Sequence, residues 1–352
     1  MIARVAMRVF VGPELCRNED WIKASLDYDI NVGTTVIMLR MFPPFLHPFL
    51  ARLMPSWYRA HGNIRAAEKI IGPEIRKRQE AMARGDYDLD EPPRDLMQWI
   101  LESSNEKEAD PDMMSLRMLV VGLAALHTTS MAMSHAMYDL CQHPEYFEPL
   151  RNEMLQVLRE DGGWQKQTIH KLKLLDSFVK ETQRWSPASL MSFNRYLRKP
   201  VTLSDGTHLP KGTHICFAAD PIQMDPQNIP GNPQEFDGFR FARKREDTSD
   251  PNNANRFQLA SVDRTSLHFG AGRYGCPGRF FASAVIKIMF CHVLLHYDFK
   301  YPEGKSRPKN IYADENIFPD PTATVLMKKR EKLEPDLETI LAVGGDLEHW
   351  SF

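Results

Sequence analysis

Apolar residues in the first half of the chain recur at the three- and four-residue spacing of amphipathic helices. This spacing predicts helices over residues 4–10, 21–28, 62–84, 114–141, 146–159 and 174–185. Several predicted ends carry the usual signals, with Gly85 after the third helix and Pro187 after the last. Asp95 is the expected N-cap of a shorter helix that runs through Ser103.

The pattern changes after residue 200. Residues 201–217 contain short β-rich runs separated by Asp205 and Gly206 and again by Pro210 and Gly212, which predicts hairpin structure. Residues 320–329 predict one further strand. The sequence shows no internal repeat and no linker, so we expect one mainly α domain with a minor β region over residues 1–352.

Residues 36–58 form an apolar and aromatic segment that prolines and arginines interrupt. One interpretation is a buried helix and loop, and the other is a surface element that enters a bilayer interface. The chain has no uninterrupted run of eighteen apolar residues, so we expect no membrane-spanning segment. Arg4 and Arg8 break the apolar run at the start, which argues against a secretory signal.

The composition narrows the class of protein. Of 352 residues, 43% are hydrophobic and 26% charged, as in soluble globular proteins, and a net charge of -2 argues against a nucleic-acid partner. The five cysteines are an odd number and include no CxxC pair, which argues against a disulfide framework and a structural zinc site. A reducing compartment is therefore expected.

The stretch HFGAGRYGCPGRFFA, residues 268–282, places Cys276 among four glycines and a proline, just before an apolar helix. Gly270, Gly272 and Gly275 fit the pattern GxGxxG, which gives a nucleotide-binding enzyme as one interpretation. That motif needs a preceding strand and a βαβ unit. Here a helix over about residues 278–297 follows instead, which argues against it.

The second interpretation is a thiolate that faces a flat cofactor. Gly272 and Gly275 lack side chains, so the backbone can approach a planar group closely. A helix that starts just after Cys276 would direct its positive end at the sulfur, which lowers the pKa of a thiol. A thiolate on haem iron donates electron density that favours cleavage of the O–O bond.

The residues Phe269, Gly272, Cys276 and Gly278 have the spacing FxxGxxxCxG. This spacing resembles the haem-binding signature of the cytochrome P-450 family. The resemblance implies the mainly α fold of that family and a haem b whose axial ligand is Cys276.

Two further motifs lie upstream of the cysteine. Glu181 and Arg184 are three residues apart and share a helix face, which by itself is typical of a solvated surface pair. Arg240 lies between two phenylalanines, and a guanidinium in such surroundings needs a carboxylate partner. The order of these motifs resembles the scaffold triad of the family, which implies that the three residues hold the fold around the haem.

The stretch AALHTTS, residues 124–130, lies in the middle of the longest apolar helix. A threonine there usually donates to the carbonyl four residues earlier. The stretch also resembles the oxygen-activating segment of the family, in which an acid precedes the threonine. That match implies that Thr128 delivers protons to dioxygen, with His127 at the position of the acid and Ala125 where glycine is usual. A histidine can relay protons near neutral pH.

Two arginines are candidates to contact haem propionates by this resemblance, and the alternative for each is an ordinary surface arginine. Arg195 is the first. The family usually has arginine or histidine two residues before the cysteine, but here Tyr274 occupies that position and Arg273 precedes it. Residues 187–194 and 318–324 are apolar with few charges, so we expect them to line the substrate side.

The resemblance also implies a reaction and its partners. A cytochrome P-450 monooxygenase inserts one atom of O₂ into a C–H bond, with electrons that NADPH supplies through NADPH-cytochrome P-450 reductase. The later motifs resemble fungal enzymes of secondary metabolism, which implies a bulky apolar substrate of terpenoid or indole-diterpene type. Family members of this kind lie on the cytosolic face of the endoplasmic reticulum membrane.

The chain begins at what resembles an internal helix of longer family members, which carry a membrane anchor and a first β-sheet before it. Two interpretations therefore stand side by side. One is a monooxygenase, and the other is a truncated, catalytically inactive haem-binding fragment. A truncated chain without the anchor would be cytoplasmic, with at most a peripheral contact with a membrane. Water exclusion is part of the chemistry, so an open haem edge would impair turnover.

Overall fold

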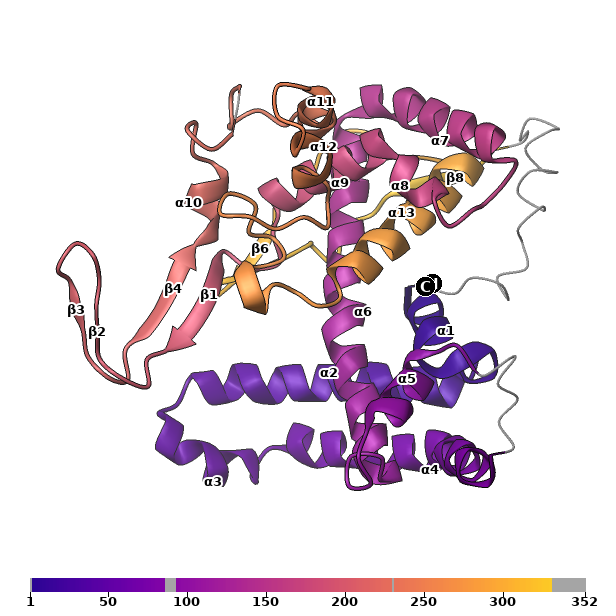
Figure 1. The fold of residues 1–352 in the computed structure, drawn as a ribbon, viewed down its shortest axis with the longest axis vertical. Helices are drawn as coiled ribbons and strands as arrows, with labels where there is room; N and C mark the ends of the chain where they lie inside the picture. The colour runs from indigo at the N-terminus through magenta and orange to yellow at the C-terminus, as the bar shows by residue number, and fades with distance from the viewer. Residues whose placement is uncertain (1, 86–92, 230, 331–352) are drawn as a thin grey trace. The chain divides into compact units, whose positions relative to one another are not determined.

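The structure is a computed structural model that describes residues 2–85, 93–229 and 231–330 (Figure 1). The chain folds as two compact units, which divide after Thr128. The long helix α6 (Pro111–Gln142) contributes residues to both units.

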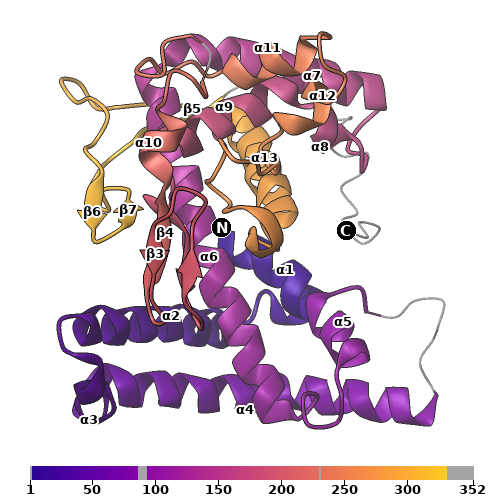
Figure 2. The same ribbon diagram turned by 60° about the vertical axis from the view of Figure 1, so that its left-hand side comes forward.

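The first unit is built entirely from helices in its described residues. They are α1 (Ile2–Leu15), α2 (Glu19–Arg40), η1 (Pro44–Leu46), α3 (His47–Ala51), α4 (Pro55–Arg84), α5 (Leu96–Ser103) and the first part of α6. The helices α2 and α4 lie side by side, joined at one end by η1 and α3 (Figures 1 and 2). Polar pairs link the two helices, with Asn31 Nδ2 donating to Asn63 Oδ1 at 3.1 Å and the hydroxyls of Thr35 and Ser56 2.7 Å apart.

Asp95 joins α4 to α5 in this unit. Its side chain accepts the backbone N–H of Gln98 and so caps α5, as the sequence predicted. The same carboxylate accepts two hydrogen bonds from the buried guanidinium of Arg78 on α4, at 2.7 and 2.8 Å. Because both charges are buried and paired in a bidentate geometry, this contact fixes the packing of the two helices.

The second unit packs the end of α6 with seven further α-helices and two 3₁₀ turns in its described residues. They are η2 (Pro144–Tyr146), α7 (Phe147–Asp161), α8 (Thr168–Lys171), α9 (Lys173–Trp185), α10 (Ala219–Gln223), α11 (Arg240–Glu246), α12 (Asn253–Arg256), η3 (Gly272–Tyr274) and α13 (Arg279–His296). The buried Asp176 of α9 accepts hydrogen bonds from Lys287 of α13 at 2.7 Å and from Arg245 of α11 at 3.3 Å. One carboxylate thus ties three helices together.

Within the described residues of the second unit, the strands form four two-stranded antiparallel ladders. They pair β1 (Met191–Tyr196) with β4 (His214–Ala218), β2 (Val201–Thr202) with β3 (His208–Leu209), β5 (Tyr297–Lys300) with β8 (Leu326–Lys329), and β6 (Ile311–Ala313) with β7 (Asn316–Phe318). The hairpin predicted over residues 201–217 is confirmed, and Gly206 at φ 88° makes its tight turn.

The mainly α fold with a minor β region is confirmed, and every helix that the pattern predicted is present. The largest difference is α2, which continues to Arg40 instead of ending near residue 28. Its last turns were missed because residues 36–38 are apolar together and hide the helical spacing. The expectation of a single domain over residues 1–352 stays a prediction.

The interpretation of residues 36–58 as a buried helix and loop is wrong. Large apolar side chains of this segment are exposed, among them Phe45 at 73% and Phe49 at 67%. The segment has few partners because it forms the turn between two long antiparallel helices, where side chains project away from both. The surface interpretation fits this arrangement.

Two helices, α6 and α13, are long and apolar enough to cross a membrane when length and mean hydropathy alone are considered. The sequence pattern did not indicate either helix as a candidate span, because neither contains an unbroken run of eighteen apolar residues. More than half of the apolar window of α13 is buried inside the protein, and core helices of globular proteins pass the same test. This composition is therefore weak evidence for a membrane span.

Candidate functional site

Cys276 lies in the loop between η3 and α13. Its backbone N–H donates to the carbonyl of Phe269 at 2.7 Å, and the N–H of Gly275 donates to the carbonyl of Gly272 at 3.0 Å. These bonds fold the loop back on itself and leave the thiol half-buried. The helix α13 begins at Arg279, within one residue of the predicted start, so its N-terminal end is directed toward the cysteine loop.

The glycines of this loop leave its backbone bare. Gly270 and Gly272 have left-handed φ values of 77° and 61°, which residues with a side chain adopt at a cost. A Cβ built on Gly272 meets no atom within 4 Å, whereas one built on Gly278 lies 3.9 Å from the sulfur of Cys276. Gly272 therefore borders open space, and Gly278 places no side chain next to the sulfur, as the close approach of a flat macrocycle requires.

Arg195 on β1 gives a second observation that fits a haem. Its guanidinium stacks 4.0 Å from the ring centre of Tyr274 and 4.4 Å from that of Phe193. Its Nη1 donates to the carbonyl of Asn194, but its Nη2 is buried with no hydrogen-bond partner in the described part of the chain. A buried donor without an acceptor is costly, and a carboxylate such as a haem propionate would satisfy it.

Arg273, the other arginine matched to a propionate, is exposed and lies 6.0 Å from the ring centre of Tyr274. The guanidinium of Arg195 lies closer to the same ring, at 4.0 Å from its centre. The two arginines differ in burial, and Arg195 is the better placed to hold an anion next to the cysteine loop.

The structure brings Glu181, Arg184 and Arg240 together. Arg184 donates to both carboxylate oxygens of Glu181, at 2.9 and 2.7 Å, and Arg240 Nε donates to Oε1 at 3.3 Å. Glu181 is 0% exposed, so the interpretation of a solvated surface pair is wrong. The apolar neighbours of Arg240 indicated this burial, but nothing in the spacing of Glu181 and Arg184 did.

The two arginines also bind the loop that precedes α11. Arg184 donates to the carbonyl of Pro233 at 2.9 Å, and Arg240 donates to the carbonyls of Asn232 and Glu235 at 3.0 and 2.8 Å. These contacts hold an irregular segment whose backbone oxygens would otherwise be buried without donors. The triad therefore fastens a loop to α9.

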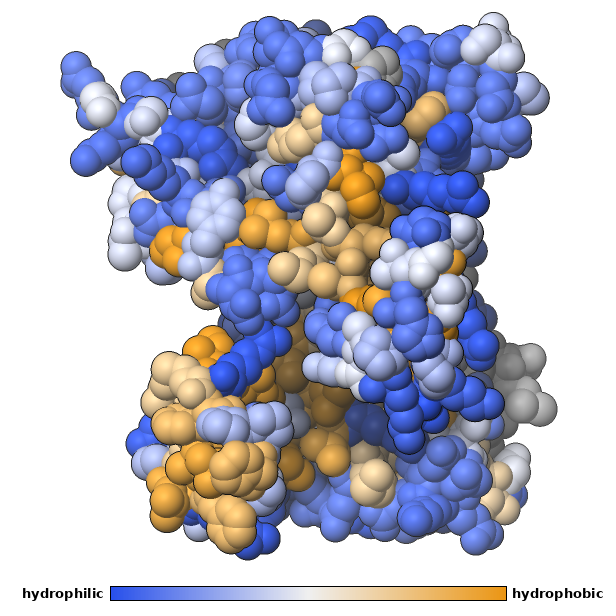
Figure 3. Space-filling model, turned by 90° about the vertical axis from the view of Figure 1, so that its left-hand side faces the viewer, coloured by the Kyte–Doolittle hydropathy of each residue, from blue (hydrophilic) through white to orange (hydrophobic). Residues whose placement is uncertain are grey.

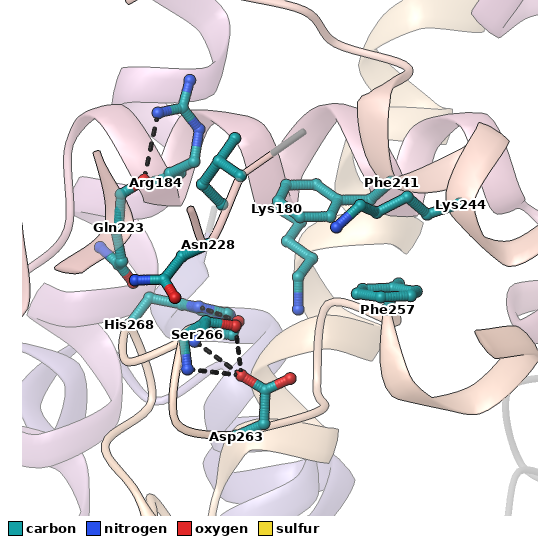
Figure 4. Close-up of a pocket in the computed structure, with 12 residues that line it drawn as sticks. Lys180, Arg184, Gln223, Asn228, Phe241, Lys244, Phe257, Asp263, Ser266 and His268 are labelled. Carbon is teal, nitrogen blue, oxygen red and sulfur yellow. Dashed lines mark hydrogen bonds between the residues drawn. The ribbon is translucent and has the colours of Figure 1, made fainter. Parts of the chain in front are cut away.

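A polar pocket lies beside the triad, and its lining residues include Lys180, Phe257, Asp263 and His268 (Figure 4). The ammonium group of Lys180 points into it and donates to the carbonyl of Gln258 at 2.9 Å. Burial lowers the pKa of Lys180 to about 8. The cavity volume of about 20 Å³ is room for about one water, so this pocket holds neither a haem nor a bulky substrate.

His268 fixes the start of the cysteine loop to this pocket. Both ring nitrogens have hydrogen-bond partners. Nε2 lies 2.8 Å from the carbonyl oxygen of Leu259, and Nδ1 lies 3.3 Å from the hydroxyl of Ser266. Burial, and then the charge of Lys180, lower the pKa of His268 to about 3, so the ring is neutral. Sequence reasoning missed this anchor because a lone histidine before the motif carries no pattern.

In the first unit, Thr128 shows the contact that a threonine in a helix usually makes, because its hydroxyl donates to the carbonyl of Ala124 at 2.8 Å. His127 has a partner that the sequence did not indicate. Its Nε2 lies 3.3 Å from Oδ2 of Asp29, a buried carboxylate on α2. Nearly a hundred residues separate the two in the chain, so no local motif could have found Asp29.

The two segments expected to line the substrate side approach each other. Leu190 donates its backbone N–H to the carbonyl of Glu315 at 2.7 Å, and Ile317 donates to the carbonyl of Ala188 at 3.4 Å. These bonds hold residues 187–194 next to β7, the strand that leads into residues 318–324 of the chain. Their role at a substrate stays a prediction.

The nucleotide-binding interpretation of the glycine loop is wrong. All ladders among the described residues are antiparallel pairs, so the βαβ unit that the motif requires is not formed there. All five cysteines are free, and within residues 2–85, 93–229 and 231–330 no three His, Cys, Asp or Glu side chains gather as metal ligands do. A cysteine at the start of a helix, a glycine-rich loop and an arginine whose buried Nη2 has no partner among the described residues are together compatible with a haem-thiolate site.

Comparison with known proteins agrees with this class. The sequence model of the family described as Cytochrome P450 matches residues 2–327. The chain is 49% identical to the cytochrome P450 monooxygenase AN1598 of Emericella nidulans and 41% identical to the ent-kaurene oxidase of Gibberella intermedia. It is also 41% identical to the cytochrome P450 monooxygenase paxP of Penicillium paxilli. The chain belongs to the cytochrome P450 family.

These matches cover 94 to 95% of the chain. They cover only 61 to 63% of each of those three relatives. The chain therefore spans about three fifths of the length of the curated relatives that it matches.

Proposed function

We propose that this chain carries the haem-thiolate site of a monooxygenase, with Cys276 as the axial ligand. The observation that carries the proposal is the cysteine loop, in which bare glycines surround a half-buried thiol at the start of α13. When bound, the haem would supply the activation of O₂ for insertion of one oxygen atom into a C–H bond. Phe269, Gly272 and Gly278 shape the backbone around the sulfur.

Arg195 would hold a propionate through its buried Nη2, with Arg273 as the weaker candidate for the same role. Glu181, Arg184 and Arg240 would serve as a scaffold, because their hydrogen bonds join them to one another and to the loop before α11. On α6, Thr128 with His127 would supply the protons that reduction of O₂ consumes. A threonine hydroxyl that donates to a carbonyl can still accept a hydrogen bond from a neighbour, which supports this role.

The substrate that we propose is a bulky apolar secondary metabolite of terpenoid or indole-diterpene type. Support comes from relatives named for ent-kaurene oxidation and from the apolar segments over residues 187–194 and 318–324. The electrons would come from NADPH through NADPH-cytochrome P-450 reductase at the cytosolic face of the endoplasmic reticulum. This is the arrangement that the family resemblance implies.

A peripheral membrane contact is part of the proposal. The turn between α2 and α4 exposes a patch of large apolar side chains (Figure 3), which includes Met41, Phe42, Phe45, Phe49 and Leu53. Apolar rings on a helical turn enter the interface of a bilayer, and the patch is larger than isolated exposed residues explain.

Vesicle flotation tests the membrane contact. The chain should float with phosphatidylcholine–phosphatidylserine vesicles, and Phe45→Ser with Phe49→Ser should abolish flotation. The matched control exchanges the exposed Tyr196 and Phe217 of the second unit for serine and should leave flotation unchanged. Equal flotation of the two double variants would contradict the contact.

Haem content tests the central assignment. Protein purified from a haem-sufficient host should contain close to one haem per chain, and Cys276→Ser should lose it or hold it without a thiolate spectrum. Cys216→Ser, which removes the exposed cysteine of β4, is the matched control and should retain the haem. A colourless wild-type protein would overturn the proposal, whereas haem without turnover would identify an inactive haem-binding fragment.

A further inference from the structure

The buried carboxylate of Asp29 on α2 is not explained by the roles proposed so far. Its side chain is 0% exposed, and neither oxygen accepts a hydrogen bond from any residue that the structure describes. The hydroxyl of Ser25, one turn earlier on the same helix, is also buried without a partner among those residues. An ionised carboxylate in such surroundings is costly unless a cation lies close to it.

The cation that lies close is His127 of α6. Its Nε2 is 3.3 Å from Oδ2 of Asp29, while 48% of the side chain is exposed. The carboxylate of Asp29 raises the pKa of His127 above its usual value, and burial opposes this in part. Tyr28, the ionisable neighbour of Asp29 on α2, stays neutral because burial and the charge of Asp29 raise the pKa of its phenol.

We infer that Asp29 is a positioning residue that keeps His127 oriented and protonated next to Thr128. The pair would replace, with residues from two helices, the single acid that precedes the threonine in the family pattern. With Nε2–H held toward Asp29, Nδ1 is the nitrogen that can release a proton and regain one from solvent. Asp29 neither gains nor releases a proton in this relay, and no electrons move. The inference rests on the proposed role of Thr128 and His127 in proton delivery.

The first test measures the pKa of His127 in the full chain, from NMR signals of the imidazole that His127→Gln identifies. Asp29→Asn keeps the shape of the side chain and removes its charge. The pKa of His127 should fall by about one unit, which is about a tenfold loss of proton affinity. Asp27→Asn is the matched control, since this exposed carboxylate on α2 pairs with Lys23 and should leave His127 unchanged. An equal pKa in wild type and Asp29→Asn would overturn the inference.

The second test needs no assigned spectrum. Because folding raises the pKa of His127, its interaction with Asp29 stabilises the fold fully below the unfolded pKa of about 6.5. That stabilisation is lost as the pH rises through the higher folded pKa. His127→Gln should therefore destabilise the wild type at pH 5.5 more than at pH 9, and this difference should vanish in the Asp29→Asn background. Strictly additive effects at both pH values would contradict a coupled pair.

The proposed function is tested separately with Thr128→Ala. If proton delivery passes through this helix, the variant should divert O₂ from product to hydrogen peroxide. An unchanged division between product and peroxide would remove the relay role, even where the pKa of His127 responds to Asp29→Asn. Conversely, an unresponsive pKa would remove Asp29 from the relay and leave the role of Thr128 intact.

Discussion

Glu181 joins three separate groups of the second unit. Its two oxygens accept hydrogen bonds from Arg184, from Arg240 and from the backbone N–H of Asp237. All of these groups are removed from water with it. Removal of one partner from such a cluster leaves uncompensated buried charge, which costs far more than an exposed ion pair contributes.

Glu181→Gln should therefore destabilise the protein by about 3 to 5 kcal/mol, because two buried guanidinium groups lose their counter-charge. Denaturant unfolding monitored by circular dichroism measures the change. The matched control is Glu148→Gln on α7, whose carboxylate contacts Arg151 but is 72% exposed, and its effect should stay within about 0.5 kcal/mol. Equal effects of the two substitutions would refute the buried triad.

At the scale of elements, the cysteine loop and the N-terminal end of α13 together position Cys276. The glycines give the loop backbone conformations that other residues avoid, and the helix that follows directs its N-terminal end to the cysteine. Two glycine substitutions with opposite expected signs separate backbone strain from ordinary packing.

Gly272→Ala should cost about 1 to 2 kcal/mol, because its φ of 61° is left-handed and its Cβ meets no atom that could be displaced. Gly33→Ala in α2 is the control. Its Cβ also meets no atom within 4 Å, but the helical backbone favours alanine, so stability should rise by up to about 1 kcal/mol. Thermal unfolding of both variants checks the signs, and a stabilising Gly272→Ala would show that the loop does not need this conformation.

The elements themselves were largely readable from the sequence. Helix ends at Gly85, Asp95 and Pro187 were found because each depends on local backbone chemistry. The full length of α2 and the exposure of residues 36–58 were missed, because both depend on which helix packs beside which. The spacing of apolar residues identifies the apolar face of a helix, but it does not show whether another element covers that face.

At the scale of the whole molecule, two histidines whose pKa is lowered by burial contribute to the response to acid. Burial lowers the pKa of His135 to about 4 and that of His268 to about 3, whereas an unfolded chain binds these protons near pH 6.5. Between these values the unfolded state holds more protons than the native state. The stability that these two rings contribute is therefore complete above about pH 6.5 and is lost progressively as the pH falls toward 4.

His135→Leu should weaken this acid sensitivity without loss of stability at pH 7. Neither ring nitrogen of His135 has a hydrogen-bond partner among the described residues, so an apolar side chain of similar size removes a burial cost. The free energies of unfolding at pH 7 and pH 5 should lie closer together in this variant, by roughly 2 kcal/mol. His170→Leu, which changes an exposed histidine of α8, should leave the acid response unchanged.

The site could be predicted from the sequence where a motif is local or where its order resembles the family's, as for Glu181, Arg184 and Arg240. Cys276 and its glycines form one continuous stretch, and the loop geometry matches what that stretch requires. Asp29 and Lys180 could not be found, since their neighbours come from distant parts of the chain and neither belongs to a spaced pattern. Burial of charge is a property of the assembled helices, which local spacing does not report.

The account depends most on the thiolate of Cys276, and the difference spectrum of the reduced protein with carbon monoxide tests it most directly. We predict the long-wavelength Soret band of a thiolate-ligated haem in the wild type and in Cys216→Ser, and its loss in Cys276→Ser. A wild-type spectrum without that band, or one that Cys276→Ser leaves unchanged, would contradict the assignment of the axial ligand.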